Sequence, residues 1–290
     1  MDVVALGELL IDFTENGVSN QGNPLFEANP GGAPCNVLAM LTKLGHKTAF
    51  IGKVGNDFFG KQLEKTIMEV GIDATGLQKD DEVHTTLALV HTYPDGDRDF
   101  SFYRNPGADM MLTEEEVPEE LIKGTRIFHF GTLSMTHEGV RKATKKAVRI
   151  AKESGALISF DPNLREPLWN SLDEAKEQVL YGLGQCDILK ISDNEIQWLT
   201  GEEDFTEGVR WIHERYDIPM ILVSMGKAGS RAYYKDFIVE VKPFIQKNTI
   251  ETTGAGDTFC AGVLHYILGH GLTELNEADL KEMLTYANAA

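Results

Sequence analysis

The sequence predicts an α/β protein in which a mainly parallel sheet is covered by helices and carries a second, smaller sheet. From about residue 126 onward, short apolar runs alternate with helical patterns and short connections, which is the order that gives a parallel sheet. Two other β-rich runs, between His84 and Arg104, follow one another with no helix between them. Such runs pair as a hairpin, so we expect them to form a small sheet that projects from the main body.

The first half of the chain supplies strands for both sheets. An apolar run that ends at Gly7 is typical of a buried strand, and the pair Gly31-Gly32 leads into a helical pattern. The segment 12–31 is polar, and we expect a lid formed by about 12–31 and 84–104. The elements expected here are strand Val3–Leu6, helix 36–41, strand 48–54, and hairpin strands 85–92 and Arg98–Tyr103 around a turn at 93–97.

The second half repeats strands and helices at short intervals. Asp161, Ser192 and Ser224 each follow an apolar strand run directly. Ligands of parallel sheets bind beyond the carboxyl ends of the strands, so these three positions are expected at the edge that forms a site. The expected strands are 127–130, 157–160, 187–191 and Met220–Ser224, and the expected helices begin at Val140 and cover Leu172–Leu183, 195–200, 205–215, a segment after Asp257, and 280–290.

Bulk composition excludes several classes of partner. The net charge of the 290 residues is −18, which argues against nucleic acid and anionic membranes. Three widely spaced cysteines form neither a disulfide framework nor a metal motif, so a reducing, cytoplasmic location is expected. No repeat or flexible linker divides the chain, and we expect one domain over 1–290. The last helical pattern runs to Ala290 without an end signal, which is typical of a chain cut short.

The segment Glu251-Thr252-Thr253-Gly254-Ala255-Gly256-Asp257 is the most informative one in the chain. It precedes an apolar helical stretch, and a helix N-terminus attracts anions through its unpaired N–H groups. An aspartate in the first turn can take a proton from an attacking hydroxyl, so the segment combines an anion hole with a base, as phosphoryl transfer requires. Taken alone, the same residues would equally suit a helix cap.

Several further motifs, in order along the chain, carry a resemblance. They are Gly31-Gly32-Ala33-Pro34-Cys35-Asn36-Val37, the run 102–110 (FYRNPGADM), the run 160–165 (FDPNLR) and the segment 251–257. Together they are similar to motifs of fructokinases in the ribokinase-like (PfkB) carbohydrate kinase family. The resemblance implies a ribokinase-like three-layer α/β/α sandwich with a mainly parallel central sheet and a small β-sheet lid. It also implies ATP-dependent phosphorylation of D-fructose to fructose 6-phosphate, with Mg²⁺.

The resemblance assigns roles to residues of the catalytic and sugar sites. Asp12 would accept hydroxyl hydrogen bonds, although by spacing alone it reads as a turn residue. Arg165 suits either sugar or phosphate oxygens or a structural salt bridge, and the two remain open. The implied catalytic residues are Gly254, Ala255, Gly256 and Asp257, and the implied substrate-binding residues are Asp12, Gly31, Gly32, Asn36, Arg104 and Arg165.

The nucleotide and metal sites are implied in the same way. Ser192 stands where the family usually has Asn, and Glu195 is expected to hold Mg²⁺ through water, with a helix-start Glu as the alternative. Glu251 replaces the usual Asp, so a K⁺ site is the least supported part of the resemblance. The implied nucleotide-binding residues are Ser192, Ser224, Gly226, Gly229 and Asn288.

Three further expectations complete the hypothesis. Asp257 beside a helix N-terminus is expected to keep a low pKa. The lid is expected to close over the sugar and to form a homodimer, with Leu87, Leu89, Phe100 and Phe102 as its apolar side chains; a surface hairpin without a partner is the alternative. A 2-keto-3-deoxygluconate kinase or other sugar kinase of the family, and an inactive scaffold, are the competing functions.

Overall fold

A nine-stranded sheet forms the centre of the molecule in the computed structural model, which describes residues 1–92, 98–244 and 254–290. The strand order is β13-β12-β11-β10-β9-β8-β1-β4-β5. All neighbours pair in parallel except at one edge, where β11–β12 and β12–β13 are antiparallel. The predicted fold class, a mainly parallel sheet with helices, is therefore confirmed. The strands are β1 (Val3–Leu6), β4 (Thr48–Gly55), β5 (Asp73–Asp80), β8 (Ile127–Gly131), β9 (Leu157–Asp161), β10 (Ile188–Ser192), β11 (Met220–Ser224), β12 (Ser230–Tyr234) and β13 (Phe237–Val241).

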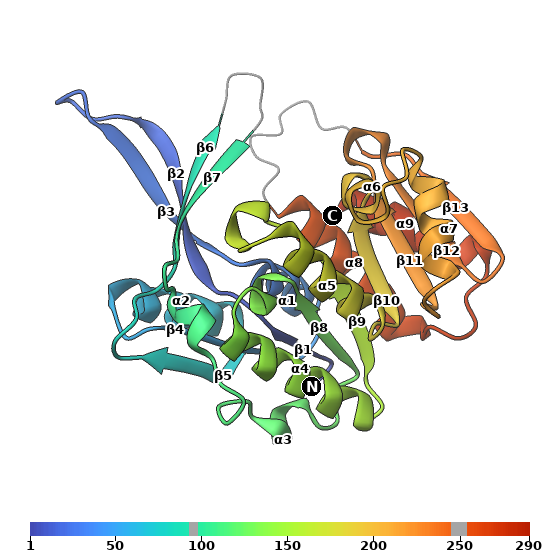
Figure 1. Cartoon of the computed structure of the whole chain (residues 1–290), viewed down its shortest axis with the longest axis horizontal. Helices are drawn as coiled ribbons and strands as arrows, with labels where there is room; N and C mark the ends of the chain where they lie inside the picture. Colours follow the sequence, from blue (N-terminus) through green and yellow to red (C-terminus); the bar gives the residue numbers. More distant parts are fainter. Residues whose placement is uncertain (93–97, 245–253) are drawn as a thin grey trace.

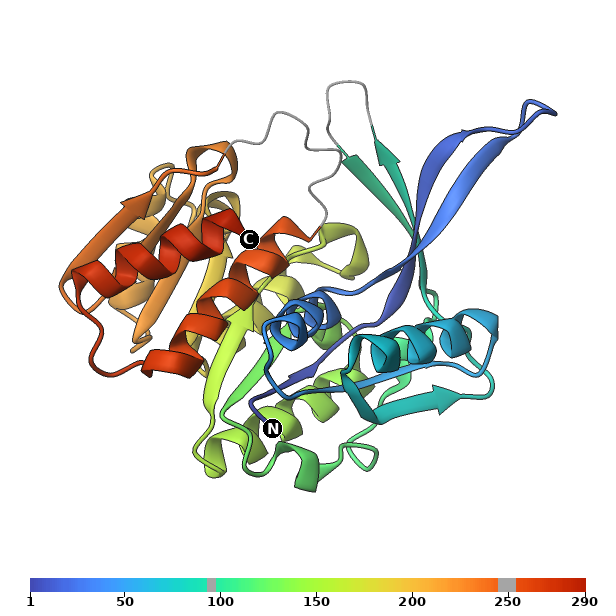
Figure 2. The same ribbon diagram turned by 180° about the vertical axis from the view of Figure 1, so that it is seen from behind.

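Helices cover both faces of this sheet, which makes three layers (Figures 1 and 2). Strands buried on both faces are mainly apolar, and two separate cores lie on the two sides. In the described residues no helix is long and apolar enough to cross a membrane. One face carries α1 (Ala33–Lys43), α2 (Phe58–Val70), α8 (Ala255–His270) and α9 (Glu277–Ala289), and the other carries α3 (Glu119–Ile122), α4 (Glu138–Glu153), α5 (Leu172–Leu183), α6 (Asp193–Thr200) and α7 (Phe205–His213).

A second sheet of four strands, in the order β3-β2-β6-β7, projects from the body (Figure 1). It consists of β2 (Leu10–Val18), β3 (Pro24–Gly31), β6 (Leu87–Thr92) and β7 (Arg98–Tyr103), and we call it the lid. Register places Asp12 beside Ala88 and Phe102 opposite Ala88, so these side chains share one face. The other face holds Phe13, which pairs with Leu89.

The two faces of the lid contact different parts of the molecule. Strand alternation alone left open which apolar side chains of the hairpin face the body. Phe100 and Phe102 face the cavity described below. Leu87 and Leu89 lie on the opposite face, where Leu87 packs against the main core beside α2. The four apolar side chains named from the sequence therefore divide between the two faces of the lid. The expected turn at 93–97 lies outside the described residues.

Some elements had no counterpart among the expectations. These are α2, β5, β12 and β13. β5 has the sequence DATGLQKD, which contains no apolar run because it lies at the edge of the sheet, where fewer of its side chains are covered. β12 and β13 continue the sheet antiparallel from β11 through a short turn, so the alternation of strand and helix stops there.

Candidate functional site

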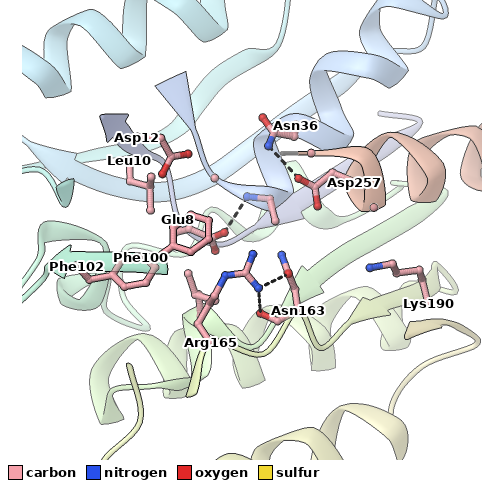
Figure 3. Close-up of a pocket in the computed structure, with 15 residues that line it drawn as sticks. Glu8, Leu10, Asp12, Asn36, Phe100, Phe102, Asn163, Arg165, Lys190 and Asp257 are labelled. Atoms are coloured by element: carbon pink, nitrogen blue, oxygen red, sulfur yellow. Dashed lines mark hydrogen bonds between the residues drawn. The ribbon is translucent and has the colours of Figure 1, made fainter. Parts of the chain in front are cut away.

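A cavity of about 270 Å³ lies between the lid and the carboxyl ends of the central strands. Side chains from the two sheets and from the loops around α1 and α8 converge on it (Figure 3). This is the edge at which a parallel sheet binds ligands. The cavity is lined by Glu8, Leu10, Asp12, Gly32, Ala33, Asn36, Phe100, Phe102, Leu133, Asn163, Arg165, Lys190, Gly254, Gly256 and Asp257.

The N-terminus of α8 opens into this cavity. Gly254 caps the helix with φ 80°, a left-handed conformation that favours glycine, and no side chain caps the first turn. Gly254 and Gly256 line the cavity directly. Unpaired N–H groups and the helix dipole at this point favour an anion. The predicted anion hole thus lies at a helix N-terminus that faces the cavity, and its role stays a prediction.

Asp257 lies in the same first turn, and a side chain of α1 binds its carboxylate. Asn36 Nδ2 donates a hydrogen bond of 2.9 Å to Asp257 Oδ2. Burial raises the pKa of Asp257, while the hydrogen bond from Asn36 and the charges of Lys190 and Arg165 oppose the rise. The expectation of a low pKa is wrong, because desolvation outweighs the helix N-terminus. A raised pKa makes this carboxylate a better base.

Lys190 brings a buried positive charge to the anion hole. It lies on β10, is 7% exposed, and its Nζ is 2.9 Å from Asp161 Oδ2. A Cβ atom placed on Gly256 would lie 3.1 Å from that Nζ. Burial disfavours the charged ammonium, but the carboxylates of Asp161, Glu195 and Asp257 together raise the pKa of Lys190. A phosphoryl group at the start of α8 would therefore meet a charged lysine.

The opposite wall of the cavity offers polar groups of the type that bind hydroxyls. Asp12 lines both this cavity and an adjoining one of about 330 Å³. A Cβ atom on Gly31 would lie 2.1 Å from Asp12 Oδ2, and one on Gly32 would lie 2.4 Å from the backbone oxygen of Glu8. Glycine at both positions lets the loop lie against its neighbours, so the predicted Asp12, Gly31, Gly32 and Asn36 are brought together here.

Glu8 was not among the predicted site residues. It follows β1, is 3% exposed, and its Oε1 accepts a hydrogen bond of 2.8 Å from the N–H of Ala33 at the start of α1 (Figure 3). Burial raises the pKa of Glu8 to about 7, against the backbone hydrogen bonds that favour its ionised form. A carboxyl group with this pKa changes its charge near neutral pH.

Arg165 faces the same cavity from the loop after β9. Its Nη1 donates to the side chain of Asn163 at 2.8 Å, and its guanidinium lies 5.5 Å from the ring centre of Phe100 in the lid. Among the described residues no carboxylate forms a salt bridge with it, which favours the ligand-binding alternative over the structural one. The lid and the body thus meet at a cation and an aromatic ring inside the cavity.

Arg104 does not line the cavity, and its expected role in substrate binding needs correction. Its guanidinium is used by the protein: Nη2 is 2.6 Å from Asp109 Oδ2, Nη1 donates to Thr136 and Nη2 to the carbonyl of Leu133. The residue after β7 turns into the body rather than over the cavity, because a partner for its charge lies five residues further along the chain. Thr86 donates to the other oxygen of Asp109.

Comparison with known proteins identifies the family. A family profile described as pfkB family carbohydrate kinase matches residues 1–290. The chain belongs to this family. It is similar to fructokinase-1 of Zea mays, at 43% identity over 99% of this chain and 89% of the relative. Two similar solved structures are fructokinase with bound ATP from Xylella fastidiosa (TM-score 0.89, 27% identity, 99% of this chain and 90% of that chain) and a fructokinase double mutant from Vibrio cholerae O395 with fructose, ADP and potassium ion bound (TM-score 0.88, 31% identity, 99% and 90%).

Glu195, the expected Mg²⁺ residue of this pfkB kinase, forms hydrogen bonds within the protein. Glu195 Oε2 accepts hydrogen bonds from the N–H and the hydroxyl of Ser192, and Oε1 accepts one from the N–H of Leu164, each at 2.8 Å. Ser192 and Glu195 form a capping box at the start of α6. In the described ranges no three His, Cys, Asp or Glu side chains converge on a metal position. Glu195 thus has the helix-start role given as its alternative, and a contact with Mg²⁺ through water stays a prediction.

The expected nucleotide residues lie along the same sheet edge. Ser192 and Ser224 end the neighbouring strands β10 and β11 in register. Gly226 and Gly229 have φ of 51° and 108° in the turn before β12, so this turn requires glycine. Asn288 on α9 binds the protein instead: its Oδ1 accepts from Ser230 Oγ at 2.9 Å, and its Nδ2 donates to the Val241 carbonyl. Glu251, on which the K⁺ question turned, lies outside the described residues.

The residues missed from the sequence carried signals that can be stated. Lys190 is a single charge inside an apolar parallel strand, where a charge is costly without a partner. Glu8 lies two residues beyond the buried strand β1, and Asp161 is the last residue of β9, so both carboxylates lie at the carboxyl ends of strands. Phe100 and Phe102 were noted as apolar, but the pattern could not say which face they share.

Proposed function

We propose that this pfkB kinase transfers the terminal phosphoryl group of ATP to D-fructose and forms fructose 6-phosphate. The observation that carries the proposal is the position of Asp257, a buried carboxylate beside the open N-terminus of α8, in a cavity that is also lined by Asn36, its hydrogen-bond partner, and by Asp12. Base, anion site and hydroxyl-binding groups thus converge on one space. Full-length similarity to plant and bacterial fructokinases supports fructose as the acceptor.

The residues divide the chemistry between them. Asp257 takes the proton of the terminal hydroxyl of the sugar. The oxygen of that hydroxyl bonds to the γ-phosphorus of ATP while the bond from this phosphorus to ADP breaks. The N–H groups of Ala255, Gly256 and Asp257 and the ammonium of Lys190 stabilise negative charge on the phosphoryl oxygens. Asn36 orients the base through its hydrogen bond. Asp12 and the Gly31-Gly32 loop hold the sugar.

ATP fits the edge formed by β10, β11 and α8. Ser192, Ser224, Gly226 and Gly229 would hold the nucleotide side, and the start of α8 with Lys190 fits phosphate because its donors face the cavity. Mg²⁺ would be held mainly by phosphate oxygens and water, as this ion prefers, with Glu195 and Asp161 nearby as carboxylates. Bound Mg²⁺ would neutralise negative charge on the phosphate oxygens. We propose no site for K⁺.

The central test is Asp257→Ala, assayed with ATP and D-fructose. Loss of a general base costs about 10²–10⁴-fold in kcat, so a fall in this range is expected. Thr258→Ala serves as a control in the same helix turn, because among the described residues its hydroxyl bonds to the Gly254 carbonyl. Turnover by Asp257→Ala within a few-fold of the wild type would remove Asp257 from the reaction.

A second candidate is supported by one observation. A 2-keto-3-deoxygluconate kinase must bind a carboxylate, and Arg165 places a cation in the cavity. A panel of neutral and acidic sugars decides: preference for the keto acid would replace fructose, and the same preference should be lost in Arg165→Gln. Absence of ATP turnover with every sugar would instead favour a scaffold function.

We propose further that two lids associate in a homodimer. The outer face of the lid exposes Phe26 and Tyr103 at 45% and 64%, and a small sheet with an uncovered apolar face is stabilised by a partner. Phe26→Glu is expected to give a monomer by light scattering and to raise the KM for fructose. Phe58→Glu, on an exposed ring of α2 outside the lid, is the matched control. A monomeric wild type at micromolar concentration would refute the dimer.

We also place the protein in the cytoplasm. Its three cysteines, Cys35, Cys186 and Cys260, are buried free thiols, which suits a reducing compartment. Cell fractionation tests this location, and recovery with an organelle would contradict it.

A further inference from the structure

The carboxyl group of Glu8 lies between the start of α1 and the cavity. Its side chain is buried between β1, α1 and the lid, yet it lines the cavity beside Leu10 and Asp12 (Figure 3). It also lines a small adjoining cavity together with His129 and Asp161. A buried acidic group needs donors for its oxygens, because an unpaired carboxylate is strongly disfavoured away from water.

One use is to cap α1. The N-cap of this helix is Gly32, which has no side chain to cap it, and Pro34 lacks an N–H. Glu8 Oε1 accepts from the N–H of Ala33 at 2.8 Å and so supplies the cap from another part of the chain. The helix held in this way carries Asn36, which binds Asp257. A cap alone would need only a neutral hydroxyl or amide group.

The second use follows from the cavity that the same side chain faces. We propose that Glu8 is a second sugar-binding carboxylate, an inference that rests on the proposed sugar kinase activity. One oxygen of Glu8 holds α1, and the carboxylate group also accepts a hydrogen bond from a hydroxyl of the bound sugar. Together with Asp12 it would give the cavity two acceptors for a polyol, from the end of β1 and from β2. Sugar binding would then add a hydroxyl donor to the backbone N–H groups of Ala33 and Glu8 that already bond to this carboxylate.

This arrangement couples sugar binding to a proton. Burial raises the pKa of Glu8 to about 7; among charged groups, Asp109 adds to the rise and Arg104 opposes it. Cys35 packs nearby on α1, and Glu8 contributes to the raised pKa of its thiol. The other titratable or charged groups on the two cavities are Asp12, His129, Asp161, Arg165, Lys190 and Asp257.

The sign of the coupling follows. A hydroxyl that donates to the carboxylate favours the ionised form and lowers the pKa of Glu8 in the complex. Binding at pH 7 is therefore expected to release roughly half a proton, because about half of Glu8 is protonated beforehand. The affinity for sugar should rise with pH between about 6 and 8 for the same reason.

The test is isothermal titration of the full chain with D-fructose in the absence of nucleotide, at pH 7, in two buffers of different ionisation enthalpy. Glu8→Gln keeps an oxygen for the Ala33 N–H but loses the carboxylate, so it should bind fructose roughly tenfold or more weakly and release no proton. Asp187→Asn is the matched control, because Asp187 Oδ2 also accepts a backbone N–H, from Ile158 at 2.7 Å, at the far end of the strands. It should bind as the wild type does.

The outcomes separate the inference from the function on which it rests. Unchanged affinity in Glu8→Gln, or equal weakening in Asp187→Asn, would leave Glu8 only its capping role and overturn the inference. If Glu8→Gln does not fold, the wild type still decides, because absence of proton release contradicts the coupling. A wild type that binds no fructose refutes fructose as substrate instead, and the sugar preferred in the substrate panel then serves in the same titration.

Discussion

Arg104→Met is expected to lower the free energy of unfolding by about 3–5 kcal/mol, the usual result of removing one partner from a buried ion pair. The side chains of Arg104 and Asp109 are 2% and 3% exposed, so water cannot replace the lost charge. The variant would leave Asp109 with the hydrogen bond from Thr86 and the Leu133 carbonyl with the one from the Thr136 hydroxyl. Methionine fills a similar length of the site, which limits the effect of an added cavity.

Urea unfolding followed by tryptophan fluorescence measures this loss, and initial rates below the transition measure the KM for sugar. Arg149→Met is the matched control, because its pair with Glu153 is exposed on α4 and worth less than about 1 kcal/mol. Arg104→Lys should lie between the two, since it keeps a charge but loses the fork that reaches three partners. The KM of the folded Arg104→Met variant should stay within a few-fold of the wild type.

The opposite pattern would refute the reasoning. Unfolding within about 1 kcal/mol of the wild type, combined with a KM raised tenfold or more, would mean that Arg104 contacts the sugar and that the buried pair contributes little. Such a result would restore the role that the sequence resemblance implied for this residue.

Three further predictions follow from close contacts and pKa shifts. Gly60→Ala should destabilise the fold by about 2 kcal/mol or more, because its Cβ would lie 1.8 Å from a backbone oxygen, whereas Gly269→Ala has open space and should be neutral or stabilising in urea unfolding. Asn36→Ala should move the acid limb of the kcat profile to higher pH, because its hydrogen bond lowers the pKa of Asp257; an unmoved limb would exclude Asp257 as the titrating base. Burial lowers the pKa of His129 to about 3, so this side chain takes up a proton in the unfolded chain first, and the free energy of unfolding falls as pH drops below about 6.5. His129→Gln should reduce the slope of the free energy of unfolding against pH in this range by up to about 1.4 kcal/mol per pH unit. An equal slope in the variant would show that His129 does not contribute.

The central part of the fold could be predicted because its sequence signals are local. A short apolar run between turn residues is a buried parallel strand wherever it occurs, and β1, β11 and α5 begin and end at the predicted residues. The edge strand β5 could not be found in this way. Its few apolar side chains reflect how little of the strand is covered, which is a property of the assembled sheet.

The site was predictable where a motif fixes backbone geometry, and less so where a side chain must find its partner. Gly254 and Gly256 were assigned from the family resemblance of segment 251–257, and they line the cavity. The environment of Asp257 could not be read, because its burial is produced by distant segments that pack around it. Arg104 was assigned to the substrate because its pairing with Asp109 had no signal in the sequence, whereas Ser192 and Glu195 have the spacing of a capping box, the alternative given for Glu195.

The hydrogen bond between Asn36 and Asp257 joins residues 221 positions apart in the chain. During synthesis at about 5–20 residues per second, roughly 10–45 s separate the emergence of the two side chains from the ribosome. A nascent chain therefore carries the sugar loop and the amide long before it carries the base and the anion hole. The cavity that Asn36 and Asp257 both line therefore forms only after α8 has been made.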